Sequence, residues 1–580
     1  MMMKIPAATI LSALSTLALA ACAGTPSPQL ADRAVPASVE LQILAINDFH
    51  GNLEIPTGTT AYSAEGETVR EVLGGAARLG ATMEALRAGQ AHSVSVAAGD
   101  LIGGTPFVSA NFLDEPAIAS LNLMKLDVAA VGNHEFDRGI AELRRIQNGG
   151  CEQNTLRTPC ALEPFDGAAF TYLAGNTVDE AGQTLFPGGV IRAVGPARIG
   201  FVGLTLRATA TLVAPSQTAG YRFLNEAETA NRLARQLLDQ GADTVVLLIH
   251  EGARVDPAQN ISACPNLSGP VVPILEELIP EIGLVVSGHT HQSYICHLPR
   301  PGAGMEASAR VLTSAGRYGS FVTDIRLSFD PVSRAVAFAT ARNVPVNGAA
   351  GENAVIDQLV ARYSAAAAPM AARVVGTLTP PADSDARTPE ACIEPVEANL
   401  VADAQLHAAR QRTGGRADMA FMNISGVRTR FPNGYDPQIT YGQIFAMQPF
   451  GNTLQVLEMS GADLYNVLEE QFCGDGLARP CFGLLAPSAN IRIRFDRSRP
   501  PGQRVLEIEH EGRGIDRQAS YRVAVNNFLA SGGDGFATFS RQPTRADAGL
   551  DLDALENWLM SGDRQMPACG RLADLTPPQV

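Results

Sequence analysis

Leu41-Gln42-Ile43-Leu44-Ala45-Ile46 runs directly into Asn47-Asp48-Phe49-His50-Gly51-Asn52. A short apolar run of this kind is typical of a buried strand, and the polar residues after it would lie where the strand ends. The same design recurs four times, in apolar runs from Ser93 to Ala98, Val128 to Val131, Thr244 to Ile249 and Leu284 to Val286. Helical stretches such as Ala76 to Arg87 and Glu226 to Gln240 separate the runs. The pattern predicts an α/β fold built in layers.

Residues that can ligate metal ions follow every one of these runs. The later runs end in Gly99-Asp100, Gly132-Asn133-His134-Glu135-Phe136-Asp137, His250-Glu251-Gly252 and Ser287-Gly288-His289-Thr290-His291. The carboxyl ends of neighbouring strands meet in one crevice, so these side chains can converge. Asp, His and Asn suit Mn, Zn, Fe or Co. Two such ions about 4 Å apart can activate water against a phosphate ester. A lone histidine at a strand end is more often structural, but five ordered motifs favour a metal centre.

The ordered set resembles the calcineurin-like metallophosphoesterases. Asn47 to Gly51 and Gly132 to Asp137 resemble the bacterial 5′-nucleotidase and UDP-sugar hydrolase branch of that family. The resemblance implies an N-terminal layered αββα metallophosphoesterase domain, a linker helix and an α+β C-terminal nucleotide-binding domain, with the active site at their interface.

The same resemblance implies two divalent metal ions and a catalytic pair. One ion would be held by Asp48, His50, Asp100 and His291, and the other by Asp100, Asn133, His250 and His289. Asp100 would bridge the two ions. His134 would stabilise the transferring phosphoryl group, oriented by Asp137.

Three segments of the second half resemble the family's substrate-binding segments. They are Asn423-Ile424-Ser425-Gly426-Val427-Arg428, in which Ser425 replaces a glycine of the family, Pro449-Phe450-Gly451-Asn452, and Asn527 to Phe536. Aromatic faces can sandwich a nucleobase, and a guanidinium group binds phosphate well. By the resemblance, Phe450 and Phe528 would stack on the base, Asn423 and Asn452 would lie near its edge, Asp534 would bind the ribose hydroxyls and Arg428 would contact phosphate.

One segment departs from the family. Glu397-Ala398-Asn399 stands where the family often has Leu-Gly-Asn, and arginines that some members place near this stretch have no match here. How tightly a terminal phosphate or a diphosphate is held therefore stays open.

The N-terminus predicts export with a lipid anchor. The run from Ile5 to Ala21 is too short to span a bilayer comfortably and suits a signal peptide. Leu19-Ala20-Ala21-Cys22 resembles a lipobox, which makes Cys22 the expected lipidation site, an ordinary secretory signal being the alternative. The expected location is the periplasmic side of the outer membrane or the cell surface.

The length predicts at least two domains after the tether, and the pattern of elements together with the resemblance implies what they are. We expect a signal peptide at 1–21, a flexible tether at 22–38, the metallophosphoesterase domain at 39–346, the linker helix at 347–376, the substrate-binding domain at 377–571 and a tail at 572–580. The net charge of −15 argues against nucleic-acid polymers as partners. A small phosphorylated substrate fits, because metal ions can outweigh the global charge.

Eight cysteines remain besides Cys22, and an exported protein can keep disulfides. The sequence contains no Cys-x-x-Cys motif, which favours disulfides over a thiolate metal site. Spacing does not determine connectivity; the pairings we expect are Cys151–Cys160, Cys473–Cys481, Cys264–Cys296 and Cys392–Cys569.

The leading function is hydrolysis of nucleoside 5′-monophosphates to nucleoside and phosphate by metal-activated water, outside the cytoplasm. UDP-sugars and 2′,3′-cyclic nucleotides are alternative substrates of the same site. A nucleotide-binding surface protein without catalysis is the alternative from another class, and the intact ligand set argues against it.

Overall fold

The computed structural model describes residues 38–577, except 65, 156, 257–260, 300–308, 381–392, 433 and 473–482. The predicted signal peptide, Cys22 and the tether up to residue 37 lie outside the described residues. Among the residues that are described, no helix is both long enough and apolar enough to cross a membrane.

The first half of the chain contains a six-stranded sheet, and the apolar run from Leu41 to Ile46 forms one of its inner strands. The strand order is β16 (Val336–Pro345), β15 (Phe321–Phe329), β1 (Val39–Ile46), β4 (Ser93–Ala98), β5 (Val128–Ala130) and β6 (Thr171–Leu173). From β1 to β6 neighbouring strands are parallel, whereas β15 and β16 are antiparallel additions. The carboxyl ends of β1, β4 and β5 therefore lie at one edge.

A second six-stranded sheet faces the first one. Its order is β13 (Ser293–Leu298), β14 (Arg310–Ala315), β12 (Ile282–Ser287), β11 (Thr244–His250), β9 (Ala197–Thr205) and β8 (Gly189–Val194). The side chains of Leu41, Ile43 and Ala45 pack with Phe201 and Val246 of this sheet in one buried cluster. Strand side chains alternate between faces, so every second residue of β1 points into the space between the sheets.

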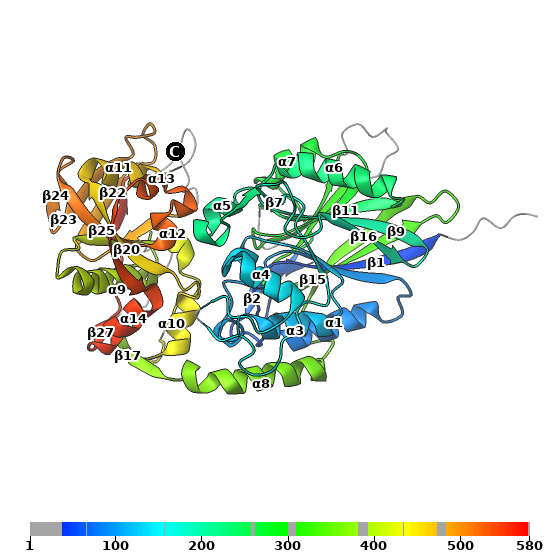
Figure 1. Ribbon diagram of the computed structural model, residues 1–580, viewed down its shortest axis with the longest axis horizontal. Coiled ribbons are helices and arrows are strands. Elements are labelled where there is room, and N and C mark those ends of the chain that lie inside the picture. Colours follow the sequence, from blue (N-terminus) through cyan, green and yellow to red (C-terminus); the bar gives the residue numbers. More distant parts are fainter. Residues whose placement is uncertain are drawn as a thin grey trace, which may run out of the picture. The chain divides into compact units, whose positions relative to one another are not determined.

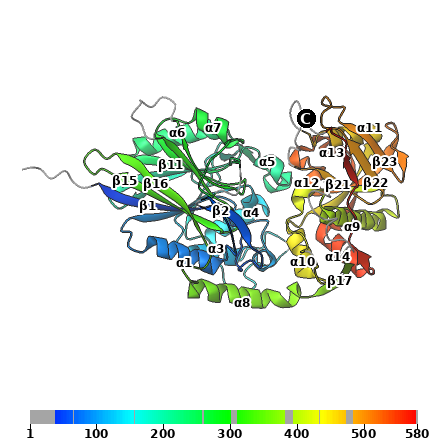
Figure 2. The same ribbon diagram turned by 180° about the vertical axis from the view of Figure 1, so that it is seen from behind.

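Helices cover the outer face of each sheet. Leu44 and Ile46 of β1 pack in a cluster with α1 (Ala76–Arg87) and α3 (Glu115–Leu123). The second sheet packs in the same way against α6 (Glu226–Asp239) and α7 (Val271–Glu277). Figures 1 and 2 show these two helix pairs on opposite sides of the strands. The predicted αββα layering is confirmed.

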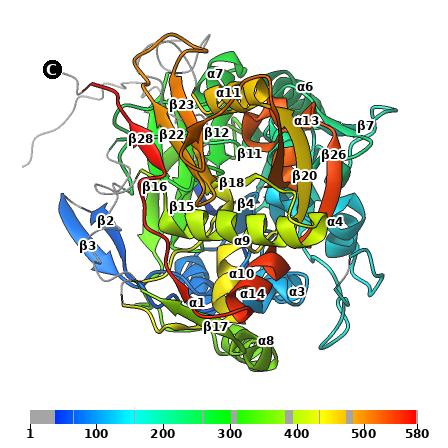
Figure 3. The same ribbon diagram turned by 90° about the vertical axis from the view of Figure 1, so that its left-hand side faces the viewer.

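The second half is a mixed α+β unit, as expected. Its largest sheet has the order β21 (Leu485–Pro487), β18 (Met419–Asn423), β25 (Ser520–Asn526), β20 (Thr453–Ser460) and β26 (Thr544–Leu550). One face packs against α9 (Val396–Thr413), and the other against α11 (Gly461–Glu469). Figure 3 shows α9 beside α14 (Asp551–Met560), which it contacts. Only β18 and β25 pair in parallel within this sheet, which brings their carboxyl ends together.

Smaller sheets complete the second half. One contains β24 (Arg513–Gly514), β23 (Val505–His510), β22 (Ile491–Phe495) and β28 (Leu572–Asp574), and the other contains β19 (Gln438–Thr440), β17 (Val374–Thr379) and β27 (Arg564–Gln565). The segment at 572–580, which the sequence analysis expects to be a tail, begins with the strand β28. A three-residue strand is too short to leave a periodic pattern in the sequence.

The linker region is helical, as predicted. α8 (Ala354–Ala371) begins after Asn353, whose side chain accepts hydrogen bonds from the backbone N–H groups of Val355 and Ile356. Such a cap satisfies donors that the first helical turn leaves unpaired.

Two predicted disulfides, Cys151–Cys160 and Cys264–Cys296, are confirmed. Cys473, Cys481 and Cys392 lie outside the described residues, so the other two pairings stay predictions.

Candidate active site

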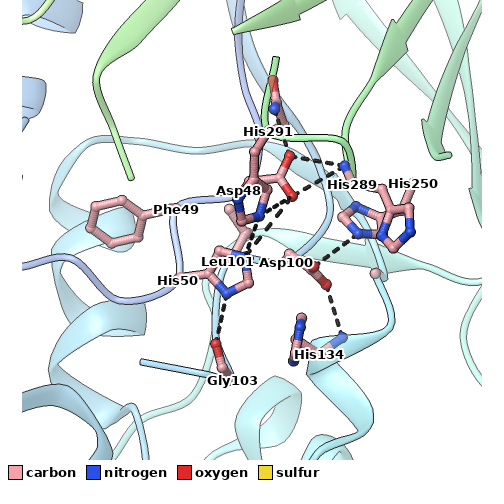
Figure 4. Close-up of polar contacts among 12 residues, drawn as sticks. Asp48, Phe49, His50, Asp100, Leu101, Gly103, His134, His250, His289 and His291 are labelled. Carbon is pink, nitrogen blue, oxygen red and sulfur yellow. Dashed lines mark hydrogen bonds and ion pairs between the residues drawn. The ribbon is translucent and has the colours of Figure 1, made fainter. Parts of the chain in front are cut away.

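The expected metal ligands converge at one edge of the two facing sheets. They follow β1, β4, β5, β11 and β12, whose carboxyl ends meet there. Three groups have ligand atoms within 4.8 Å of one another: Asp48 with His50 and His291, His50 with Asp100 and His134, and Asp100 with His250 and His289. Figure 4 shows Asp48 and Asp100 in the middle of the histidines.

The backbone at these ligands is unusual. Five of them, none a glycine, have positive φ angles: Asp48 at 49°, His50 at 46°, Asp100 at 50°, His289 at 70° and His291 at 60°. A non-glycine residue pays a steric penalty in this conformation, and such residues cluster at functional sites. These five residues follow β1, β4 and β12, so the chain adopts the left-handed conformation after three of the five strands that carry ligands.

Glycines next to the ligands leave room for this convergence. A Cβ atom on Gly132 would lie 2.3 Å from Oδ1 of Asp100, and one on Gly288 would lie 2.9 Å from Oδ2 of Asp48. Backbone atoms are equally close, with Asp100 N at 2.5 Å from the first Cβ and Ala98 O at 2.8 Å from the second, so a larger residue would require the backbone to shift. The glycines beside the ligands are therefore required for close approach.

The histidine rings are oriented by backbone carbonyls. Nδ1 of His50 lies 2.8 Å from the Gly103 carbonyl oxygen, and Nδ1 of His250 lies 2.7 Å from that of Ala98. In each ring Nδ1–H donates to the carbonyl, so Nε2 faces the centre. Nε2 of His50 lies 3.2 Å from Nε2 of His291 and 3.7 Å from Oδ2 of Asp100.

Two buried atoms fit a metal centre better than a hydrogen-bonded network. Nε2 of His250 lies 2.9 Å from Oδ2 of Asp100, but the contact lacks hydrogen-bond geometry. Oδ1 of Asn133 is also buried and has no hydrogen-bond partner among the described residues. An unpaired buried polar atom is unfavourable unless something else satisfies it. The donor set of carboxylate, imidazole and amide oxygen suits first-row divalent cations.

The electrostatics of the centre also favour cations. Burial raises the pKa of Asp100, but the neighbouring His250, His134 and His50 together outweigh burial and hold this pKa well below its usual range. Burial lowers the pKa of His250, yet the Asp100 carboxylate raises it to about 10. Burial, with the nearby His250, lowers the pKa of His289 to about 3. Two ionised carboxylates thus stabilise positive charge at this position, which bound cations would supply.

Glu135 is a functional residue that the sequence analysis left unassigned. Its carboxylate accepts hydrogen bonds from the backbone N–H groups of Asp100, Leu101 and Gly132, at 3.0, 2.8 and 2.7 Å. Burial, together with the Asp100 charge, raises its pKa to about 7. Glu135 therefore fixes the loops that carry two ligands. Its place in the Gly-Asn-His-Glu motif was the available signal, because a glutamate between ligands is rarely a free surface residue.

The predicted catalytic pair lies together beside the metal ligands. Nδ1 of His134 is 2.9 Å from Oδ2 of Asp137, and the backbone N–H of His134 donates to Oδ1 of Asp100 at 2.8 Å. Burial lowers the pKa of His134, but Asp137 and Asp100 outweigh burial and raise it. The two carboxylates thereby favour the protonated imidazole, which is the form that donates hydrogen bonds from both ring nitrogens.

A cavity of about 210 Å³ adjoins this pair. All six residues predicted to bind substrate line it, although they come from distant segments: Asn423, Arg428, Phe450, Asn452, Phe528 and Asp534. Asn133, His134, Asp137 and His289 line it from the side of the metal centre, while the other five metal ligands do not. Residues 212–214 and Gln217 also line the cavity, and nothing in their sequence pattern indicated this.

Arg428 and Phe450 connect the two sets of residues. The Phe450 ring stacks on the His134 ring, with centroids 5.7 Å apart and planes within 16°. The Arg428 guanidinium lies over Phe450 at 5.5 Å. Nε and Nη2 of Arg428 are buried without a hydrogen-bond partner among the described residues. A guanidinium edge in this state is suited to an anion that enters the cavity.

Two family models match the chain. The model of calcineurin-like phosphoesterases matches residues 41–293, and that of the 5′-nucleotidase C-terminal domain matches residues 374–541. The chain is 29% identical over 553 residues to the cell wall protein Lmo0130 of Listeria monocytogenes, covering 90% of this chain and 67% of that protein. It is 26% identical over 569 residues to a probable 5′-nucleotidase of Treponema pallidum, covering 86% and 87% of the two chains.

The fold also matches a solved structure, a 5′-nucleotidase precursor from Thermus thermophilus. The TM-score is 0.72 at 23% identity, covering 93% of this chain and all of the other. At this low sequence identity the match supports the two-domain fold and nothing further about function.

Proposed function

The chain belongs to the 5′-nucleotidase family of calcineurin-like phosphoesterases, and on that premise we propose that it hydrolyses nucleoside 5′-monophosphates to nucleoside and phosphate. As a member of this family it is a metal-dependent phosphoester hydrolase. The specific substrate, the use of two ions and the place of action are our proposals.

The shared cavity is the observation that carries the proposal. Its wall includes His134 and His289 of the metal centre and the aromatic rings of Phe450 and Phe528, with the Phe450 ring stacked on His134. Arg428 also lines it and presents a guanidinium edge without a hydrogen-bond partner among the described residues. A nucleoside 5′-monophosphate carries the matching groups, an anion for the metal ligands and Arg428 and a flat base for the aromatic rings.

The two ligand sets would hold divalent cations, which lower the pKa of a coordinated water and balance the charge on phosphoryl oxygens. A water oxygen then bonds to phosphorus while the bond to the ribose 5′ oxygen breaks, and that oxygen leaves as a hydroxyl after taking a proton.

The protein's own residues contribute position and charge. His134, held by Asp137, donates a hydrogen bond to the phosphoryl group, and Arg428 donates to its other oxygens. Phe450 and Phe528 stack on the base, Asn452 lies at its edge and Asp534 accepts from the sugar. The amide of Asn423 is largely used inside the protein, as described below, which leaves it little capacity for the base.

Phosphate release by the purified protein tests the proposal. AMP, UDP-glucose, 2′,3′-cyclic AMP and bis(p-nitrophenyl) phosphate form the panel, each with and without Mn²⁺ after chelation. We expect metal-dependent release from AMP that is lost in His134→Ala and kept in His297→Ala, whose histidine is exposed on β13. Metal binding without hydrolysis of any ester would refute the enzymatic proposal and favour a nucleotide-binding surface protein.

A neighbouring cavity supports nucleotide sugars as a second candidate substrate class. This cavity measures about 460 Å³ and shares Asp137, Gln217, Phe450 and Gly451 with the first. Arg138 and Arg157 line it, and it offers space for a group attached to the phosphate. UDP-glucose hydrolysis faster than AMP hydrolysis would establish this alternative.

We also propose that the protein acts outside the cytoplasm on a lipid anchor at Cys22. The lipobox-like Leu19-Ala20-Ala21-Cys22 supports this proposal. Labelled palmitate should enter the full chain and not the Cys22→Ser variant; equal labelling of both would refute it.

A further inference from the structure

Ser425 stands where the family pattern has a glycine, and its hydroxyl contacts Asp534. Asn423 ends β18, Ser425 lies in the short helical turn η4 (Ile424–Gly426), and Asp534 lies in the turn η5 (Gly533–Gly535). Ser425 Oγ donates a short hydrogen bond to Oδ2 of Asp534. Both residues line the substrate cavity.

A second donor reaches the same carboxylate oxygen. Nδ2 of Asn423 donates to Oδ2 of Asp534 at 3.1 Å and to Oγ of Ser425 at 2.8 Å. Oδ1 of Asn423 in turn accepts from Nδ2 of Asn526 at 3.0 Å. This last contact exists because β18 and β25 run in parallel and end side by side. The Asn526 amide thus orients the Asn423 amide, whose Nδ2 contacts both Oδ2 of Asp534 and Oγ of Ser425.

The two oxygens of Asp534 are therefore unequal. Each carboxylate oxygen offers two lone pairs, and on Oδ2 both are occupied by Asn423 and Ser425. Oδ1 receives no hydrogen bond from the described residues, and it is not among the buried unpaired atoms. Asp534 itself is held by a positive φ of 55°, which limits its freedom to turn. One oxygen is thus available to a ligand.

We infer that Ser425 is a specificity-determining residue which restricts Asp534 to one strong contact with the sugar of the substrate. The inference rests on the proposed function and deepens it. A free carboxylate can bind the 2′ and 3′ hydroxyls of ribose together, one on each oxygen. Here the Ser425 hydroxyl and the Asn423 amide occupy Oδ2, so this oxygen has no lone pair left for a second sugar hydroxyl.

Ser425 is itself only a weak substitute for Asp534 Oδ2 as an acceptor for the second sugar hydroxyl. Its hydroxyl donates to Asp534 and accepts from Asn423, which leaves a single lone pair for a ligand. A neutral hydroxyl is a weaker acceptor than an ionised carboxylate. Removal of one sugar hydroxyl should therefore lower kcat/KM strongly, and removal of the other should lower it weakly.

The test measures kcat/KM of the full chain for AMP, 2′-deoxy-AMP and 3′-deoxy-AMP. In the native protein one deoxy analogue should lose about 10- to 100-fold, the effect of a hydrogen bond to a charged group, and the other no more than about threefold. In Ser425→Ala and Ser425→Gly the weakly affected analogue should become at least about tenfold worse than AMP, because Oδ2 then accepts the second hydroxyl. Ser425→Thr, which keeps a hydroxyl, should retain the native ratio.

Ser540→Ala is the matched control, since this exposed serine of the same domain donates to the Ala537 carbonyl and lies outside the set of residues that line the cavity. Calorimetric binding of adenosine and its two deoxy forms gives a readout that needs no turnover and also detects misfolded variants. Equal losses for both analogues in the native protein, or ratios unchanged by Ser425→Ala, would overturn the inference alone. Absence of any nucleoside binding or nucleotide hydrolysis would overturn the proposed function and the inference with it.

Discussion

Replacing Arg428 tests the link between the cavity and the metal centre most directly. The guanidinium lies over Phe450, which stacks on His134, and its Nε and Nη2 atoms are buried without a partner among the described residues. These two N–H groups share one edge of the planar group and can bind two oxygens of a phosphate. Arg428 should therefore make two charge-assisted hydrogen bonds to the substrate.

The expected magnitude follows from these two bonds. Each bond to a charged group is worth about 1.5–3 kcal/mol, so Arg428→Ala should lower kcat/KM for AMP by about 10²- to 10⁴-fold. Arg428→Lys keeps the charge but not the fork, and we expect it to recover about half of that free energy.

Phosphate release at several AMP concentrations gives kcat/KM, and calorimetry shows whether adenosine still binds. Arg430→Ala is the matched control, because Arg430 is exposed two residues further along. A loss below about fivefold in Arg428→Ala, with the variant folded, would refute the reasoning.

Three further predictions follow from the site and its surroundings. Removal of metal ions by EDTA should abolish AMP hydrolysis and lower the melting temperature, because bound ions stabilise the folded state. Addition of Mn²⁺ should restore both the activity and the melting temperature. Activity that survives complete removal of metal would contradict a metal-dependent site. Gly132→Ala places a Cβ 2.3 Å from Oδ1 of Asp100 and should destabilise the fold by about 1–3 kcal/mol, as measured by urea unfolding. It should also reduce the amount of bound metal, as measured by elemental analysis. Gly58→Ala, which has open space around it, should have neither effect. Burial raises the pKa of Asp551 to about 7, so the folded state binds more protons than the unfolded state between about pH 4 and 7, and stability falls as the pH rises through that range. Asp551→Asn should therefore gain about 2–4 kcal/mol over the native protein at pH 8 and little at pH 5; parallel pH profiles of unfolding would count against this.

Much of the first domain could be predicted from the sequence, because its signals are local. Ser93–Ala98 and Ala76–Arg87 form a strand and a helix with the predicted bounds, since continuous apolar runs and helical periodicity report burial directly. The ligands could be assigned because each follows such a run. The antiparallel strands β15 and β16 were not predicted, since the residues of a strand do not indicate its partner strand.

The parts that could not be predicted depend on contacts between distant residues. The role of Glu135 arises from three backbone N–H groups on two loops, and that of Ser425 from a carboxylate 109 residues away. Residues 212–214 carry no motif and line the cavity only because of where the chain passes. Periodicity and motif spacing describe single segments, so they contain none of this information.

The left-handed residues of the metal centre have a consequence for protein engineering. Because Asp48, His50, Asp100, His289 and His291 all adopt positive φ angles, their side-chain directions are set by the loops and not by the strands. Copying the seven ligand residues onto the strand ends of another sandwich, with ordinary turns, would aim the side chains elsewhere. A designer who wished to transplant this centre would have to graft whole strand-and-loop units with their glycines, and would need a scaffold stable enough to bear the backbone energy of all five.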